Sequence, residues 1–199
     1  MAALDDILTG RGTAMALHAL AGRYHLPPEA VAAALVRVRP WVMADVARLI
    51  DRPGGLHELI HWLADPAVAR IAHQPAAVID QGVRVAGDAM HRGLTRGDQS
   101  LWQRFDEMAR DLAMSHQSLR AMTPALTLII LAAVREASRP AFLRLLHAVR
   151  PDDARTDPFS FAAEHAERIA ERPLRPGAAL RWLDGVLARA HHDAESGRV

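Results

Sequence analysis

The sequence lacks three residue types whose absence excludes whole classes of chemistry. There is no cysteine, no lysine and no asparagine, and all 24 basic residues are arginine. Without cysteine the chain has no disulfide, no thiolate nucleophile and no cysteine-ligated zinc or iron–sulfur cluster. Without lysine it has neither a Walker A phosphate loop nor a Schiff-base lysine. Without asparagine it has no N-glycosylation site.

The sequence also has few aromatic residues and a small net charge. Aromatic residues make up 5% of the 199 residues, hydrophobic residues 50%, and the net charge is +1. Such a chain buries enough apolar surface to fold, and it lacks the positive excess typical of nucleic-acid-binding proteins. Asp5 and Asp6 interrupt the N-terminal segment, so it lacks the continuous apolar core of a signal peptide. The longest uncharged apolar stretch, residues 121–134, is too short for a membrane span. We therefore expect a cytoplasmic protein with no membrane segment.

Helical periodicity dominates the chain, and no convincing alternating strand is present. The predicted fold is all-α: a multi-helix orthogonal bundle with two helix-turn-helix-like units and a helical C-terminal appendage. We expect a domain at residues 1–149, then a linker and a two-helix extension at 150–199. Prolines, glycines and capping residues place the helix boundaries. The expected helices are residues 13–24, 28–38, 41–50, 56–64, 67–73, 76–92, 99–114, 115–139, 141–149, 159–172 and 176–192, with Pro140 bending the chain rather than ending a helix.

Residues 20–31 and 108–119 align without gaps at an offset of 88 residues. Each segment predicts the end of one helix, a turn that contains an apolar residue, and the start of a second helix, as in a helix-turn-helix unit. In the first unit an acidic residue, Glu29, leads the second helix, although Arg37 and Arg39 are available for phosphate. The second unit has side chains suited to reading DNA. Its candidate nucleic-acid residues are Ser115, His116, Gln117 and Arg120, although the net charge makes nucleic acid an improbable partner.

Four segments, residues 19–31, 51–56, 87–90 and 122–126, resemble a bacterial family of unknown function related to the YidB-like proteins. The resemblance extends over about residues 1–138. It implies an all-helical fold with a homeodomain-like arrangement of helices, and it supplies no catalytic residues. The chain departs from that family in having more histidine and arginine, fewer glycines and an added tail from Arg150.

The pattern with the most specific chemistry is His57-Glu58-Leu59-Ile60-His61, which matches H-E-x-x-H. On a helix both histidines can ligate zinc, while the glutamate activates the bound water. No third ligand lies at the usual spacing, however, and Asp65-Pro66 ends the helix. Leu56, Leu59, Ile60 and Leu63 also form an ordinary core-facing stripe. The candidates to complete the coordination are Asp65, His73, Asp80 and His91, and the spacing to the motif singles out none of them.

These observations favour a non-catalytic helical interaction or scaffold protein that binds a protein partner or self-associates through its last helix. We therefore expect no catalytic residue and no cofactor. The first alternative is a zinc-dependent hydrolase that uses His57, His61 and Glu58. The second is a DNA-binding helix-turn-helix protein.

Overall fold

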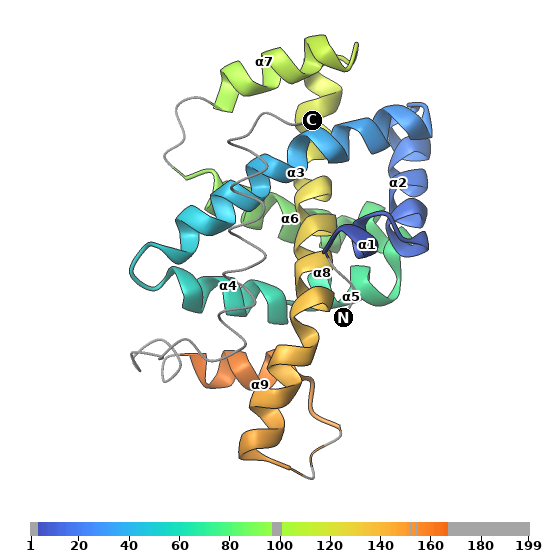
Figure 1. Cartoon of the computed structure of the whole chain (residues 1–199). Helices are drawn as coiled ribbons and strands as arrows, with labels where there is room; N and C mark the ends of the chain where they lie inside the picture. Colours follow the sequence, from blue (N-terminus) through green and yellow to red (C-terminus); the bar gives the residue numbers. More distant parts are fainter. Residues whose placement is uncertain (1–3, 97–100, 152, 154, 167–199) are drawn as a thin grey trace.

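The computed structural model of the chain describes residues 4–96, 101–151, 153 and 155–166, and these residues form helices without a strand (Figure 1). The all-α prediction is thus confirmed. The elements are α1 (Leu4–Leu8), α2 (Arg11–Tyr24), α3 (Pro28–Ile50), α4 (Gly55–Ala64), α5 (Pro66–His73), the 3₁₀ helix η1 (Pro75–Ile79), α6 (Gln81–Leu94), α7 (Leu101–Asp111), α8 (His116–Val149) and α9 (Pro158–Glu164).

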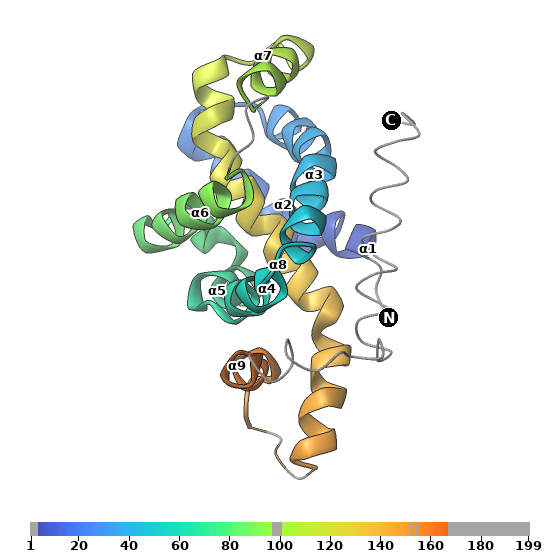
Figure 2. The same ribbon diagram turned by 90° about the vertical axis from the view of Figure 1, so that its left-hand side faces the viewer.

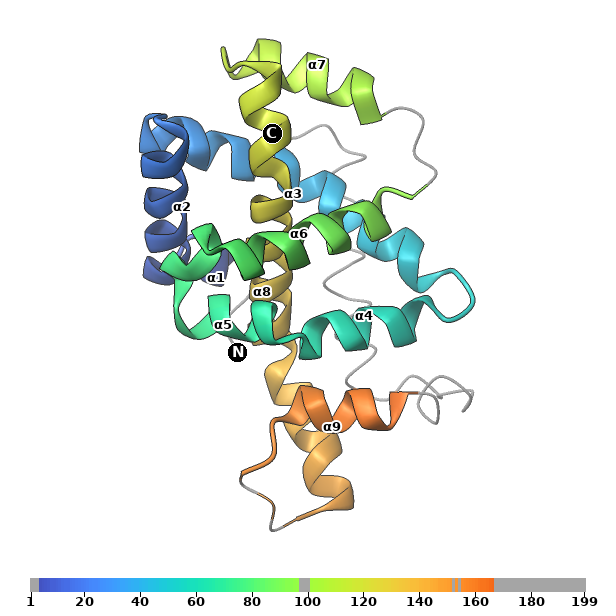
Figure 3. The same ribbon diagram turned by 180° about the vertical axis from the view of Figure 1, so that it is seen from behind.

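The long helix α8 forms the axis of the fold. Helices α2 and α3 pack on one side of it, and α5 and α6 pack on the other (Figures 1 and 3). The segment from Ala125 to Arg135 is buried throughout. By length and composition α8 is apolar enough to cross a membrane, but 72% of its most apolar window is buried within the fold. A core helix passes the same test, and the other helices here supply the apolar surroundings that α8 requires.

Two prolines lie inside α8 without ending it. The segments predicted at residues 115–139 and 141–149 are parts of one helix that continues through Pro124 and Pro140, so the prediction that Pro140 does not end a helix is confirmed. A proline removes one backbone donor and disturbs the preceding turn. The carbonyl of Ala121 in that turn accepts a hydrogen bond from the Tyr24 hydroxyl at 2.8 Å. Packing around α8 thus outweighs the local cost of the prolines. Pro40 likewise lies within a continuous α3.

The single helix predicted for residues 76–92 is wrong. Pro75 opens the short 3₁₀ helix η1, Asp80 is extended at φ −66° and ψ 143°, and α6 begins at Gln81. The Asp80 carboxylate pairs with the Arg70 guanidinium of α5 at 2.6 Å. This ion pair between α5 and Asp80 favours the break between η1 and α6. The helical periodicity of residues 76–92 does not predict it.

The 88-residue correspondence extends to the backbone of the two turns. His25 and Ala113, which are 88 positions apart, both adopt the left-handed conformation, with φ of 52° and 48°. The next residue in each turn donates its N–H to a carbonyl five positions earlier, Leu26 to Ala21 and Met114 to Ala109, both at 3.0 Å. This is the hydrogen bond that closes a Schellman-type helix end. The two turns thus share one local geometry.

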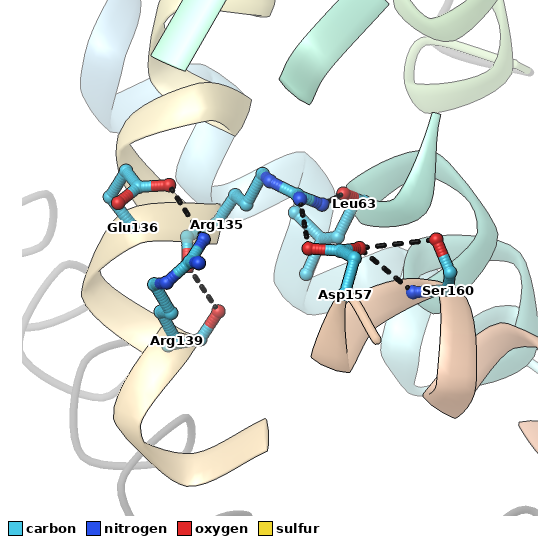
Figure 4. A network of polar contacts seen from close by, with 7 residues as sticks. Leu63, Arg135, Glu136, Arg139, Asp157 and Ser160 are labelled. Carbon is cyan, nitrogen blue, oxygen red and sulfur yellow. Dashed lines mark hydrogen bonds and ion pairs between the residues drawn. The ribbon is translucent and has the colours of Figure 1, made fainter. Parts of the chain in front are cut away.

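The helix at the start of the predicted extension, α9, packs against α4 and against the C-terminal part of α8 (Figure 2). Phe159 is fully buried and belongs to the main core. The buried guanidinium of Arg135 holds this corner together, because it donates to the Leu63 carbonyl of α4 and to the Asp157 carboxylate (Figure 4). The predicted helix at residues 176–192, with its proposed role in self-association, lies outside the described residues, as does the end of the one predicted at 159–172.

Candidate functional site

The H-E-x-x-H segment lies on α4, where a close backbone approach sets the start of the helix. Gly54 is left-handed at φ 76°, and a Cβ on Gly55 would lie 1.6 Å from the Leu49 carbonyl oxygen. Only glycine fits at residue 55 in this connection. The predicted stripe is confirmed at Leu59, Ile60 and Leu63, which are buried.

The two histidines of this motif are brought together at the edge of that stripe. The Nε2 atoms of His57 and His61 are 3.1 Å apart, and the two rings meet edge to face. His61 is exposed and His57 half-buried. The Glu58 carboxylate lies to one side, near α6, with Oε1 3.6 Å from the position that a Cβ on Gly93 would occupy. His57 and His61 therefore lie on the same face of α4, as their spacing predicts.

Of the four residues considered as further ligands, His73 is the exposed last residue of α5, and the other three make contacts of their own. Asp65 caps α5 by accepting the N–H of Ala67 at 2.7 Å, Asp80 pairs with Arg70, and His91 contacts α8. Among the residues that the structure describes, no group of three or more histidines and carboxylates can hold a metal ion. Within residues 4–166 as described, the arrangement thus supplies two nitrogen ligands without the third protein ligand typical of a catalytic zinc.

The four residues proposed for DNA lie around the first turns of α8. Ser115 is the N-cap and accepts the Ser118 N–H at 3.0 Å. His116 is 3.4 Å from the Asp106 carboxylate, whereas Gln117 and Arg120 are exposed.

In the first helix-turn-helix-like unit the two arginines considered for phosphate contact carboxylates instead. Arg37 pairs with Asp111 of α7 at 3.4 Å, and Arg39 pairs with Asp5 of α1. The described surface of this unit thus offers phosphate little uncompensated charge.

A groove between α6, α7 and α8 combines charged and polar side chains with an apolar wall. Its volume is about 420 Å³, within the range typical of ligand sites. Arg120, a candidate for binding DNA, and His91, a candidate for binding metal, lie here together with residues that the sequence did not single out for binding. The lining residues are Asp88, His91, Arg92, Thr95, Phe105, Arg120 and Pro124.

The contacts of His91 define its protonation. The Thr127 hydroxyl donates to the Thr123 carbonyl at 3.0 Å, so its oxygen is left to accept from His91 Nδ1, 3.3 Å away. This assigns the hydrogen to Nδ1 and leaves Nε2 as an acceptor. Burial lowers the pKa of His91, and the Asp88 carboxylate only partly offsets that effect. His91 is therefore neutral near pH 7, and the charged groups of the groove are two arginines and one aspartate.

Sequence reasoning missed this groove because its residues come from three helices. Asp88, His91, Arg92 and Thr95 share one face of α6 at spacings of three and four residues, which is the one signal that the sequence contains. In the sequence alone this face of α6 looks the same as a solvated helix surface, because the sequence does not show that α7 and α8 pack beside it.

Comparisons of the chain with models of protein families, with curated proteins and with solved structures found no match. The resemblance to the YidB-like proteins therefore stays a prediction, as do the bacterial origin and the cytoplasmic location.

Proposed function

We propose that this protein is a non-catalytic helical interaction module whose α6–α7–α8 groove binds an acidic segment of a partner protein. The observation that carries the proposal is the orientation of Arg92. Its Nε donates to the Asp88 backbone carbonyl, 3.1 Å away and one turn earlier on α6. That bond fixes the guanidinium against the helix and leaves its two terminal amino groups without a partner among the described residues.

The chemistry of the groove suits a carboxylate on an apolar neighbour. Arg92 and Arg120 line the groove together with Asp88, while the neighbouring His91 is neutral. A guanidinium binds carboxylate with two parallel hydrogen bonds, which gives geometric selectivity as well as energy. Phe105 and Pro124 supply the apolar wall. A glutamate or aspartate flanked by an aromatic side chain meets both requirements.

The test is binding of a capped tripeptide, Ac-Glu-Phe-Glu-NH₂, followed by amide chemical shifts in the full chain. We expect the perturbed amides to cluster at residues 88–95, 105 and 120–123. Arg92→Gln should weaken binding by about 10- to 100-fold, because it removes charge-assisted hydrogen bonds of about 1.5–3 kcal/mol.

Two controls keep the result specific. Arg144→Gln makes the same charge change on an exposed residue of α8 about 36 Å along the helix from Arg120, and it should leave binding unchanged. Ac-Gln-Phe-Gln-NH₂ preserves shape without charge and should bind weakly. Equal binding of the two peptides, or equal affinity of the Arg92→Gln variant and the wild type, would overturn the proposal.

The alternative functions find less support in the described residues. A zinc hydrolase needs a third protein ligand beside His57 and His61, and a DNA-binding surface needs more basic charge than the ends of α3 and α8 present. The interaction module is therefore the function that the geometry favours.

A further inference from the structure

We propose that His57 and His61 of α4 form a two-nitrogen chelate for a borderline divalent transition metal such as Ni²⁺, Cu²⁺ or Zn²⁺. This site is separate from the α6–α7–α8 groove and independent of the proposed function. It requires neither a third protein ligand nor a role for Glu58 in catalysis.

The spacing of the two nitrogens suits one ion. Imidazole nitrogens bind zinc at about 2.0–2.1 Å. Two Nε2 atoms 3.1 Å apart would then subtend about 98° at the metal, between the square-planar and the tetrahedral angle. The helix backbone holds both side chains on one face, so chelation needs little reorganisation of the pair.

No other described group competes for the two rings. The contact between Nε2 of His57 and Nε2 of His61 is the only polar contact that either side chain makes within the described part of the chain. In that contact one Nε2 carries a hydrogen. When a metal binds both Nε2 atoms, that hydrogen moves through solvent to Nδ1 of the same ring, and each imidazole stays neutral. Binding thus exchanges a weak exposed hydrogen bond for two coordinate bonds.

The environment determines what kind of site this is. His61 is exposed, and α4 places no carboxylate against the pair, because Glu58 lies toward α6. Among the described residues no further ligand adjoins the pair, so the remaining coordination positions are open to water or to an added ligand. Neutral imidazoles without a thiolate favour Cu²⁺, Ni²⁺ and Zn²⁺ over Mg²⁺ or Ca²⁺. The site is thus an exchangeable surface chelate rather than a closed structural zinc centre.

Titration of the full, tag-free chain with NiCl₂ tests the chelate by calorimetry and by thermal unfolding. We expect one Ni²⁺ per chain in the tightest class, and at least a tenfold loss of affinity in His57→Gln and in His61→Gln. The double variant should lose much less than the sum of the two single losses, since either single variant already removes the chelate and leaves one monodentate imidazole. Ni²⁺ should also raise the unfolding temperature of the wild type, because the pair is assembled only in the folded helix.

His18→Gln is the matched control, since His18 is an exposed histidine on another helix, α2. It should leave affinity and Ni²⁺-dependent stabilisation unchanged. Wild-type affinity in both α4 variants, or equal weakening by His18→Gln, would refute the chelate. Far-UV circular dichroism of each variant verifies that α4 is not lost with its ligands.

Discussion

The contacts of Arg135 predict that α9 depends on a buried ion pair. Its side chain is 2% exposed, donates to the Leu63 carbonyl, and donates to Asp157 Oδ1 at 2.7 Å. The guanidinium carbon also lies 4.1 Å from the centre of the Phe159 ring. Burial lowers the pKa of Arg135, while the Asp157 carboxylate raises it. Removing that carboxylate would leave a charged group inside the fold without its counter-ion.

The loss of stability expected on replacing Asp157 is the sum of two contributions, because Asp157 has two separable roles. It compensates Arg135, and it caps α9 by accepting the Ser160 N–H at 3.0 Å. Losing one partner of a buried pair costs about 3–5 kcal/mol, and the low end applies here because the Asp157 side chain is 33% exposed. Losing an N-cap costs about 1 kcal/mol. Asp157→Ala should therefore destabilise the fold by about 4 kcal/mol, and Asp157→Ser, which retains a capping oxygen, by about 3 kcal/mol.

Urea unfolding of the full chain measures both losses, and hydrogen exchange of the α9 amides locates them. The double variant Arg135→Met with Asp157→Ser removes both charges and should be more stable than Asp157→Ser alone, because no unpaired buried charge remains. If Asp157→Ala and Asp157→Ser both unfold within about 0.5 kcal/mol of the wild type, a range typical of neutral surface changes, the ion pair does not stabilise α9. Equal losses in the two variants would remove the capping role instead.

Two further predictions concern the α7–α8 turn and the groove. Ala113→Gly should stabilise the chain by about 0.5–1 kcal/mol in urea unfolding, because glycine adopts the left-handed backbone at φ 48° without the steric cost that alanine incurs; a loss of stability would contradict this. Burial lowers the pKa of His91, so the unfolded chain binds a proton that the folded chain resists, and stability is lost as the pH falls through about 6.5 toward the lower folded pKa. His91→Gln should flatten the dependence of the urea midpoint between pH 7 and pH 5, and an unchanged slope would refute that assignment.

Local signals predicted the elements whose ends depend on their own residues. Pro28 opens α3, Asp65 caps α5, and Gly54 precedes α4, which begins at Gly55, as each residue type favours. The stripe of α4 is buried for the reason that its spacing indicates. In these places sequence and structure agree because the interactions extend over a few residues.

Interactions between distant segments account for the errors and omissions. Local periodicity describes residues 115–139 and 141–149 as separate segments on either side of Pro140, whereas α8 continues through both toward α9 and buries Leu146. Asp80 leaves the helix that its neighbours predict and pairs with α5. The groove joins α6 to residues of α7 and α8, and the periodicity of one helix does not identify which helix packs beside it. Each of these outcomes depends on partners far away in the sequence.

Because every basic residue is arginine, both the buried contacts of Arg135 and the ligand contact proposed for Arg92 depend on the shape of the guanidinium group. Arg135 reaches two acceptors in different directions through its two terminal amino groups, the carbonyl of Leu63 and the carboxylate of Asp157. Arg92 binds its own helix through Nε and keeps its terminal amino groups for a ligand. A lysine ammonium is a single point on a flexible stem, so it cannot be anchored by one nitrogen while it presents others. Arg92→Lys would preserve the charge of the groove and lose the fixed direction, which is why the absence of lysine matters more for the shape of recognition here than for the total charge.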